Sequence, residues 1–232
     1  MLSLPELLNQ LKFVTSETAL LGLFITATTI LLSKDWRVLI MSLLAQYILV
    51  GIMLLRLVRP DIAVLKVLIG AFICPILFLS ARQISGRASS SLIGASSFSF
   101  TQWRRLSDGM SALTGQYSST PTGLVFRIFV GLIMILVTLT VSSSFPLPGL
   151  ASSVTTAVYW LVIAGLVTLV ITEDPLKAGH GLFTVLLGFD LFYATLESSL
   201  LLTGLWGSVN LLIALAVGYL TVVKGTGLEE EV

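Results

Sequence analysis

The sequence predicts an all-α membrane protein, a polytopic bundle of about seven transmembrane helices. Of its 232 residues, 56% are hydrophobic and only 11% are charged, whereas an average soluble domain carries roughly 25% charged residues. Apolar runs of about 20 residues recur along the chain, and each is long enough to cross about 30 Å of hydrocarbon. The runs are continuous rather than alternating, which favours helices over the strands of a barrel. We therefore exclude a soluble enzyme.

The positions of the apolar runs define the expected helices. The first residues are leucine-rich and are interrupted by Glu6 and Lys12, which is typical of a short amphipathic helix on the membrane surface rather than of a cleavable signal. Pro75, which follows Cys74, is expected to kink the third span. The expected spans are Glu17–Leu32, Val38–Val58, Ile62–Ala81, Gly123–Val141, Ser153–Thr172, Ala178–Thr203 and Ser208–Val223.

A polar segment separates the third expected span from the fourth. Residues 82–122 are rich in serine and glycine and contain four arginines, which is typical of a linker or an extramembrane loop. On either side of it, Ser33-Lys34-Asp35 and Thr172-Glu173-Asp174 are similar short charged turns between two spans. We interpret the chain as two three-helix units, in residues 1–81 and 153–232, joined by this linker and by an extra span within residues 123–152.

The basic residues predict an orientation for the bundle. With seven spans and the N-terminus outside, nine Lys and Arg residues lie on the cytoplasmic side and four on the outer side. The positive-inside rule favours this arrangement. We therefore expect a cytoplasmic linker and C-terminus, in the inner (cytoplasmic) membrane of a bacterium or an archaeon.

Two carboxylates lie inside the sixth expected span. Asp190 and Glu197 are separated by about two helical turns, so they share one face and lie about 10 Å apart along the axis. A carboxylate at membrane depth costs roughly 2.5–3.5 kcal/mol. Two of them on one face indicate a hydrated or protein-lined path that handles protons or cations. The structural alternative is that Asp190 bonds to a neighbouring helix and Glu197 lies near the interface.

Other polar residues within the expected spans have weaker signals. Lys66 either extends its side chain to the membrane surface or pairs with a buried carboxylate. His180, the only histidine, either passes a proton towards Asp190 or simply lies at the start of a helix. A further set is expected to make polar contacts between helices. Its members are Gln46, Asn210 and Tyr193.

The composition argues against several other functions. The net charge is only +1, so we expect no nucleic-acid partner. The single cysteine, Cys74, cannot form an internal disulfide or a cysteine-based metal site, and one histidine cannot provide both axial ligands of a haem. We therefore expect no catalytic site, no cofactor and no metal in this chain.

One segment of the sixth expected span resembles a known family. In Gly188-Phe189-Asp190-Leu191-Phe192-Tyr193-Ala194, an acidic residue follows a glycine and an apolar residue, as in the second helix of the K subunit of respiratory complex I. Similar three-helix units occur in the C subunit of multi-subunit sodium/proton antiporters and in component E of hydrogenase-4. The two-unit arrangement looks most like component E. Residues 41–46 and 75–82 resemble the N-terminal part of that component. Three features depart from the family pattern. The seventh span has no carboxylate, Glu197 has no counterpart in the family, and the linker is unusually long.

The resemblance implies a small integral subunit of a complex I-like, hydrogenase-like or antiporter-like membrane assembly. Such a subunit would help to translocate protons or sodium ions through Asp190 and Glu197, with Lys66 as a modulator, while redox chemistry takes place elsewhere. Its partners would be membrane lipid and other integral membrane subunits. Two other functions stay open, a stand-alone secondary transporter, which an internal repeat would suit, and a purely structural scaffold subunit.

Overall fold

The computed structural model describes residues 16–33, 35–93, 121–196 and 199–225, and the regular structure of this part is entirely helical. Six of its helices are long and apolar enough to cross a membrane, and α2 is a shorter apolar helix of 17 residues. The protein is therefore a multi-pass helical membrane protein, as predicted. The helices are α2 (Ser16–Leu32), α3 (Trp36–Leu57), α4 (Pro60–Ile93), α6 (Pro121–Ser144), α7 (Ser152–Ile171), α8 (Pro175–Leu196) and α9 (Leu200–Gly225).

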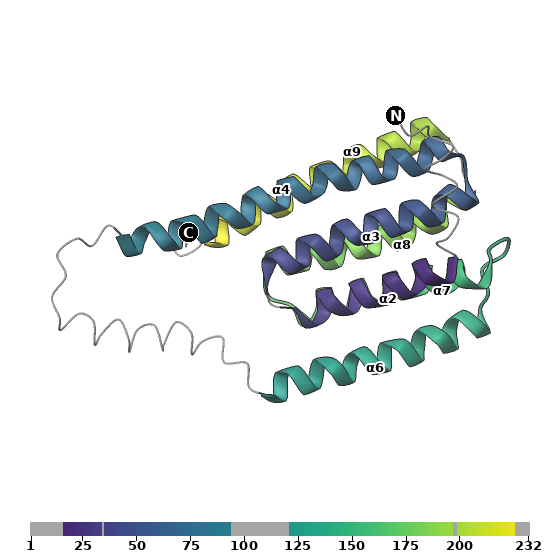
Figure 1. Ribbon diagram of the computed structural model, residues 1–232, viewed down its shortest axis with the longest axis horizontal. Coiled ribbons are helices and arrows are strands. Elements are labelled where there is room, and N and C mark those ends of the chain that lie inside the picture. Colours follow the sequence, from purple (N-terminus) through teal and green to yellow (C-terminus); the bar gives the residue numbers. More distant parts are fainter. Residues whose placement is uncertain (1–15, 34, 94–120, 197–198, 226–232) are drawn as a thin grey trace.

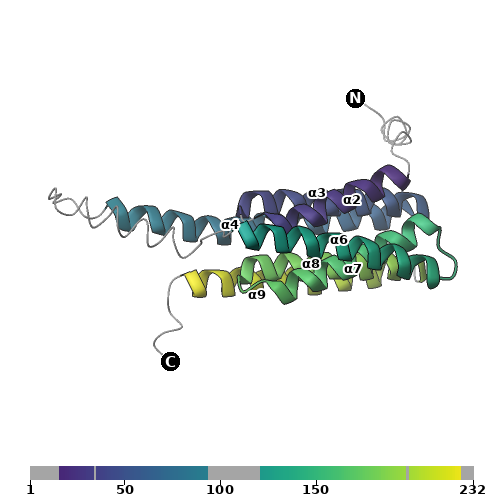
Figure 2. The same ribbon diagram turned by 90° about the horizontal axis from the view of Figure 1, so that it is seen from below.

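The helices form two layers of three, with α6 at one edge (Figures 1 and 2). In one layer α3 contacts α2 and α4, and in the other α8 contacts α7 and α9. Across the layers α2 lies against α7, α3 against α8 and α4 against α9, whereas α6 packs on α7 and α2. Successive helices alternate in direction, so each helix runs the same way as its counterpart in the other layer (Figure 1).

Several expected helix ends differ from the structure, and one of them is the start of the seventh span, which was expected at Ser208 and is observed at Leu200. Helix α4 continues to Ile93, past the expected end at Ala81, because residues 82–93 contain one glycine and no proline to stop it. Helix α8 ends at Leu196 and α9 begins at Leu200, so the expected sixth span, Ala178–Thr203, extended too far. The boundary was missed because apolar residues resume directly after Ser199, whose carbonyl accepts the amide of Thr203 at 3.1 Å.

Close helix contacts at small residues hold the bundle together. A Cβ atom added at Gly165 on α7 would lie 2.6 Å from the carbonyl oxygen of Gly181 on α8, so only glycine permits this approach.

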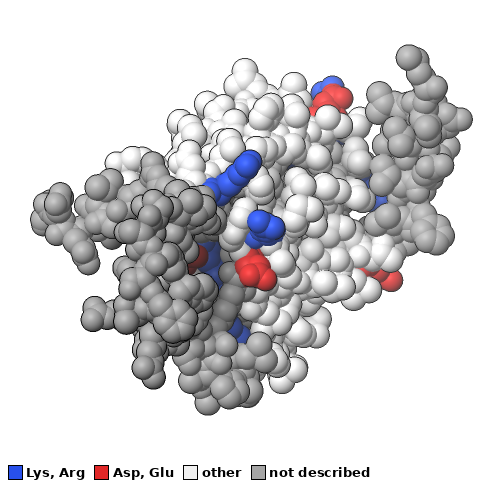
Figure 3. All heavy atoms as spheres, turned by 60° about the vertical axis from the view of Figure 1, so that its left-hand side comes forward, with Lys and Arg blue, Asp and Glu red and all other residues white. Residues whose placement is uncertain are grey.

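Helix α4 continues as a helix through Pro75. Among the described residues in Figure 3, most of the visible surface belongs to uncharged residues, as lipid contact requires. The expected amphipathic N-terminal helix lies outside the described residues.

Candidate functional site

A buried ion pair joins the two layers. Nζ of Lys66 on α4 lies 2.7 Å from Oδ1 of Asp190 on α8, and the two side chains are 3% and 2% exposed. Because α3 and α9 each contact both of these helices, the pair spans the diagonal of the α3, α4, α8 and α9 group. Both residues lie within membrane-spanning segments. Of the two alternatives considered for Lys66, the structure therefore shows pairing with a buried carboxylate.

The helical repeat places both charged residues on buried faces. On α4, Ile62, Ile69 and Ile73 are 6% exposed or less and share a face with Lys66, because residues three and four apart are neighbours on a helix. On α8, Leu187 and Leu191 are fully buried beside Asp190. Neither charged group can therefore reach water without a change in packing. Removing one member of such a pair typically costs about 3–5 kcal/mol, because the other is left as an uncompensated buried charge.

The second carboxylate oxygen of Asp190 has a different environment. Oδ2 is buried and has no hydrogen-bond partner within the described residues, and the same holds for the indole Nε1 of Trp206 on α9. The Trp206 ring lies 5.4 Å from the ring of Phe189, the residue before Asp190. The indole N–H is close enough to interact with the carboxylate electrostatically. A small movement of either side chain would therefore give Oδ2 a donor.

Tyr47 on α3 completes the surroundings of the carboxylate. Its ring is packed against Gly70 on α4, where a Cβ atom would overlap it. The side chain is 1% exposed, and its hydroxyl has no hydrogen-bond partner in the described part of the chain. The hydroxyl interacts electrostatically with Asp190. Of these three groups, only Lys66 is bonded to the Asp190 carboxylate.

A second polar cluster lies between α3 and α8, nearer the start of α8. The hydroxyl of Thr184 lies 3.1 Å from Oε1 of Gln46, to which it donates, and 2.8 Å from the carbonyl oxygen of His180. His180 is fully buried, and its Nδ1 lies 2.7 Å from the carbonyl oxygen of Leu176. Its Nε2 has no partner among the described residues. Along the α8 axis Thr184 lies about 9 Å and His180 about 15 Å from Asp190.

The remaining predicted site residues have varied outcomes. Gln46 makes the expected contact between helices, through Thr184. Asn210 on α9 is fully buried, but its side-chain amide has no partner within the described residues, so the expected contact is not observed there. Tyr193 is half-buried and its ring stacks on Phe189 at 5.7 Å. Glu197 lies outside the described residues.

Sequence reasoning missed Tyr47 and Trp206. Both are aromatic residues with a polar atom, and such residues usually find a hydrogen-bond partner when they are buried. A signal was present, because Tyr47 directly follows Gln46 and Trp206 precedes Asn210 by one helical turn. Their proximity to Asp190 depends on contacts between different helices, which a single apolar sequence does not encode.

Comparisons of the chain with family models, with curated proteins and with solved structures find no match. The fold and the site therefore define the class by themselves. The protein is a polytopic helical membrane protein whose two three-helix layers are bridged by a buried lysine–aspartate pair.

Proposed function

We propose that the protein is an integral membrane subunit that helps to translocate protons or other cations, and that the Lys66–Asp190 pair carries the charge. The observation that supports this function is the 2.7 Å contact between two almost fully buried charged groups on different layers. Ionisable residues inside a membrane are costly and typically mark ion pathways or proton relays.

The pair can hold a proton in two ways. Transfer of one proton from Nζ of Lys66 to Oδ1 of Asp190 converts an ammonium–carboxylate pair into a neutral amine and a carboxylic acid. The net charge of the pair is zero in both forms. Uptake of a further proton by Asp190 would leave the charged Lys66 without its counter-ion, and an uncompensated buried charge favours rearrangement. Protonation would thereby be coupled to the packing of the α3, α4, α8 and α9 group, whose diagonal the pair spans.

Neighbouring donors would stabilise the carboxylate during such a change. Trp206 and Tyr47 each present a buried donor without a partner among the described residues, and both interact with the Asp190 carboxyl group. If Lys66 moved away, either group could donate to the carboxylate in its place. We assign Trp206 and Tyr47 as positioning residues for Asp190.

The distribution of basic residues between the two ends of the bundle supports the proposed orientation. Among described side chains of Lys and Arg outside the buried pair, two lie where α3 ends and α4 begins, namely Arg56 and Arg59. The opposite end of the bundle carries Arg37, Arg82, Arg127, Lys177 and Lys224. The positive-inside rule would place this second end in the cytoplasm, with the C-terminal end of α9.

Membership of a larger assembly rests on the resemblance of residues 188–194 to small subunits of complex I-like, hydrogenase-like and antiporter-like complexes. Purification in a mild detergent with mass spectrometry of co-purifying proteins tests it. Antiporter-like membrane subunits together with hydrogenase or quinone-reductase components would support it. Recovery as a single chain or a homodimer would instead favour a stand-alone transporter. The parallel orientation of corresponding helices in the two layers also suits a transporter.

The role of the ion pair is tested in membrane vesicles or proteoliposomes that contain the intact assembly and a pH-sensitive dye. We expect Asp190→Asn to abolish proton movement and Lys66→Met to reduce it strongly. The matched control is Asp61→Asn, which removes a carboxylate from the exposed Arg59–Asp61 pair, 3.1 Å apart, and should leave transport unchanged.

A double variant separates transport from a structural role. Buried ion pairs can often be replaced by apolar residues without loss of stability. If Lys66→Met combined with Asp190→Leu gave a folded assembly with normal proton movement, the pair would be structural and the protein a scaffold. Loss of proton movement in a normally assembled double variant is the result that our proposal expects.

A further inference from the structure

Unpaired polar atoms gather on one side of the Lys66–Asp190 pair, inside the group formed by α3, α4, α8 and α9. Gln46, His180 and Asn210 are fully buried. The Nε2 atoms of Gln46 and His180 and both amide atoms of Asn210 have no hydrogen-bond partner within the described residues. Buried polar groups are normally bonded to protein or to ordered water. Several unpaired groups in one region therefore indicate a place that water can enter.

The packing of α3 on α8 places two of these groups between the ion pair and the end of the bundle where α8 begins. Along α8, Thr184 lies about 9 Å and His180 about 15 Å from Asp190 towards that end. The 3.1 Å contact of Thr184 with Gln46 brings the α3 amide to the depth of Thr184.

The packing of α9 on α8 places Asn210 in the same region. The Trp206 ring contacts Phe189, whereas a Cβ atom at Gly179, near the start of α8, would overlap Val217. Asn210 follows Trp206 by one helical turn, so its depth falls between these two contacts. We call the four residues of this region the polar column, namely Gln46, His180, Thr184 and Asn210.

The opposite side of the ion pair is apolar in the part of the chain that the structure describes. This side is the shorter one, because Asp190 lies about 9 Å from the end of α8 and about 22 Å from its start. The buried polar side chain on this side of the four helices is Thr203, whose hydroxyl donates to the carbonyl oxygen of Ser199 at 3.0 Å. The other buried side chains there are Met53, Leu54, Ile62, Ala63, Leu191 and Ala194.

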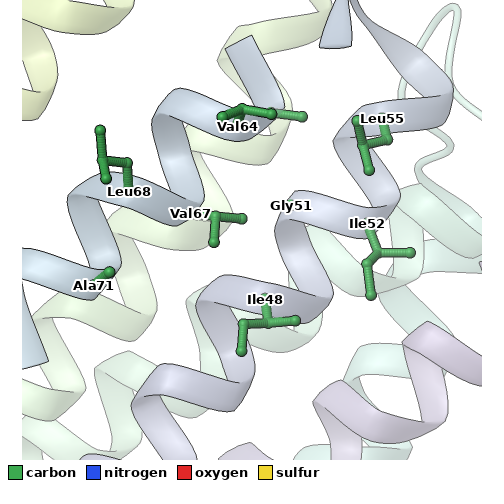
Figure 4. A pocket seen from close by; sticks show the side chains of 9 residues that line it. Ile48, Gly51, Ile52, Leu55, Val64, Val67, Leu68 and Ala71 are labelled. Atoms are coloured by element: carbon green, nitrogen blue, oxygen red, sulfur yellow. The ribbon is translucent and has the colours of Figure 1, made fainter. Parts of the chain in front are cut away.

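The outer surface beside Lys66 is apolar too. A groove of about 380 Å³ lies there between α3 and α4, and every residue that lines it is apolar. Val64 and Leu68, on either side of Lys66 along α4, belong to one wall, and Ile48 and Ile52 of α3 belong to the other (Figure 4). Water needs polar partners to occupy a site, so this groove offers it no route to the pair.

We propose that water reaches the Lys66–Asp190 pair from one side only, along the polar column from the end of the bundle where α8 begins. The column residues are 2% exposed or less, so water enters when the packing around α8 loosens. Each unpaired donor or acceptor then gains a partner, which offsets the cost of leaving it unbonded. The column is also the route of the transported protons, a step that rests on the proposed function, and the apolar side chains opposite keep them from crossing directly.

The test measures water access by the reaction of introduced cysteines with silver ion, since thiols react as thiolates in water. Cys74, the single cysteine of the chain, is first replaced by alanine. Thr184→Cys probes the column, and Ala164→Cys is the matched control. Both positions are 2% exposed, and they lie at similar depths because Gly165 packs against Gly181.

Vesicles of both orientations are treated with silver ion, and the thiols left unblocked are alkylated after denaturation and counted by mass spectrometry. We expect silver to block Thr184→Cys from the side where α8 begins and not from the other side, and to block Ala164→Cys from neither. Asn210→Cys repeats the measurement on a second helix. Reaction of the column cysteines from both sides or from neither, or equal reaction of Ala164→Cys, would overturn the proposal.

Proton movement in vesicles that contain the intact assembly separates the column from the ion pair. Gln46→Leu and Asn210→Leu should reduce proton movement, whereas Thr203→Val, outside the column, should not. Normal proton movement in both leucine variants, with Asp190→Asn inactive, would show that protons reach the pair by another route. Normal proton movement in Asp190→Asn would instead contradict the proposed function and leave the one-sided reaction with silver standing.

Discussion

Trp160 on α7 donates its indole N–H to the carbonyl oxygen of Leu23 on α2, at 3.1 Å. The tryptophan is fully buried, and its ring stacks on Phe24 with centroids 4.2 Å apart. This contact joins the first helices of the two layers, whereas the Lys66–Asp190 pair joins helices of the other half of the bundle. The layers are therefore held together by polar contacts at several separate places, since Thr184 of α8 also donates to Gln46 of α3 and Lys177 of α8 donates to the end of α2.

Trp160→Phe should destabilise the bundle by about 1–2 kcal/mol, because it removes a hydrogen bond between membrane helices and leaves a cavity. The free energy of unfolding in mixed micelles measures this loss. Tyr219→Phe on the lipid-facing surface, where the side chain is 70% exposed, is the control and should change little. Equal stability of the two variants would show that the indole contact contributes nothing to layer packing.

Single and double replacements of the buried pair should differ in stability. Lys66→Met and Asp190→Leu should each destabilise the fold by about 3–5 kcal/mol, because each leaves a buried charge without its partner. The double variant should recover most of this loss, since no charge then remains buried. Unfolding of all three variants in the same micelles measures the coupling. Additive losses would contradict the direct pairing of the two side chains.

Lys177 should matter more for stability than Lys224. Nζ of Lys177 donates to the carbonyl oxygens of Leu31 and Ser33, at 2.9 and 3.0 Å, and so binds carbonyl groups where α2 ends. Lys177→Met should therefore cost about 1–3 kcal/mol. Lys224 is exposed and donates to the carbonyl oxygen of Glu173 at 2.6 Å, where water can replace it. Lys224→Met should cost less than about 0.5 kcal/mol, and thermal unfolding in detergent compares the two.

Replacement of two glycines by alanine should affect the stability of the fold differently. Gly165→Ala would bring Cβ to within 2.6 Å of the carbonyl oxygen of Gly181, and relief of this overlap would separate α7 from α8 at a cost of about 1–3 kcal/mol. Gly204 on α9 has open space around its Cβ position, so Gly204→Ala should be neutral or slightly stabilising. Denaturant unfolding of both variants measures the difference. A tolerated Gly165→Ala would show that the α7–α8 contact can relax.

Much of the fold was predictable because hydrocarbon imposes a simple rule on the chain. Each crossing must satisfy its own backbone hydrogen bonds, so long apolar runs become helices. In the part of the chain that the structure describes, each expected span therefore corresponds in order to a helix, six of which are long enough to cross a membrane. Helix ends were harder to predict, since Leu200–Thr203 is apolar enough to belong to either neighbour. The cap at Ser199 becomes clear only from its bond to Thr203.

The candidate site was predictable in part. Asp190 and Lys66 were recognisable because charge within an apolar helix is costly wherever the helix packs. Pairing of Lys66 with a buried carboxylate was one of two alternatives that the sequence left open, and the sequence did not connect Tyr47 or Trp206 with either residue. The roles of Glu197 and His180 in a proton path stay predictions.

The sequence by itself determined the class of protein, the approximate extent of each helix and the presence of charge at membrane depth. Only the tertiary structure decided which helices are neighbours and hence that Lys66 meets Asp190 across the diagonal between α4 and α8. The reason is that lipid and helix surfaces are equally apolar, so hydropathy does not distinguish one helix neighbour from another. That choice depends on close packing at small residues such as Gly165 and on pairing of the few buried polar groups.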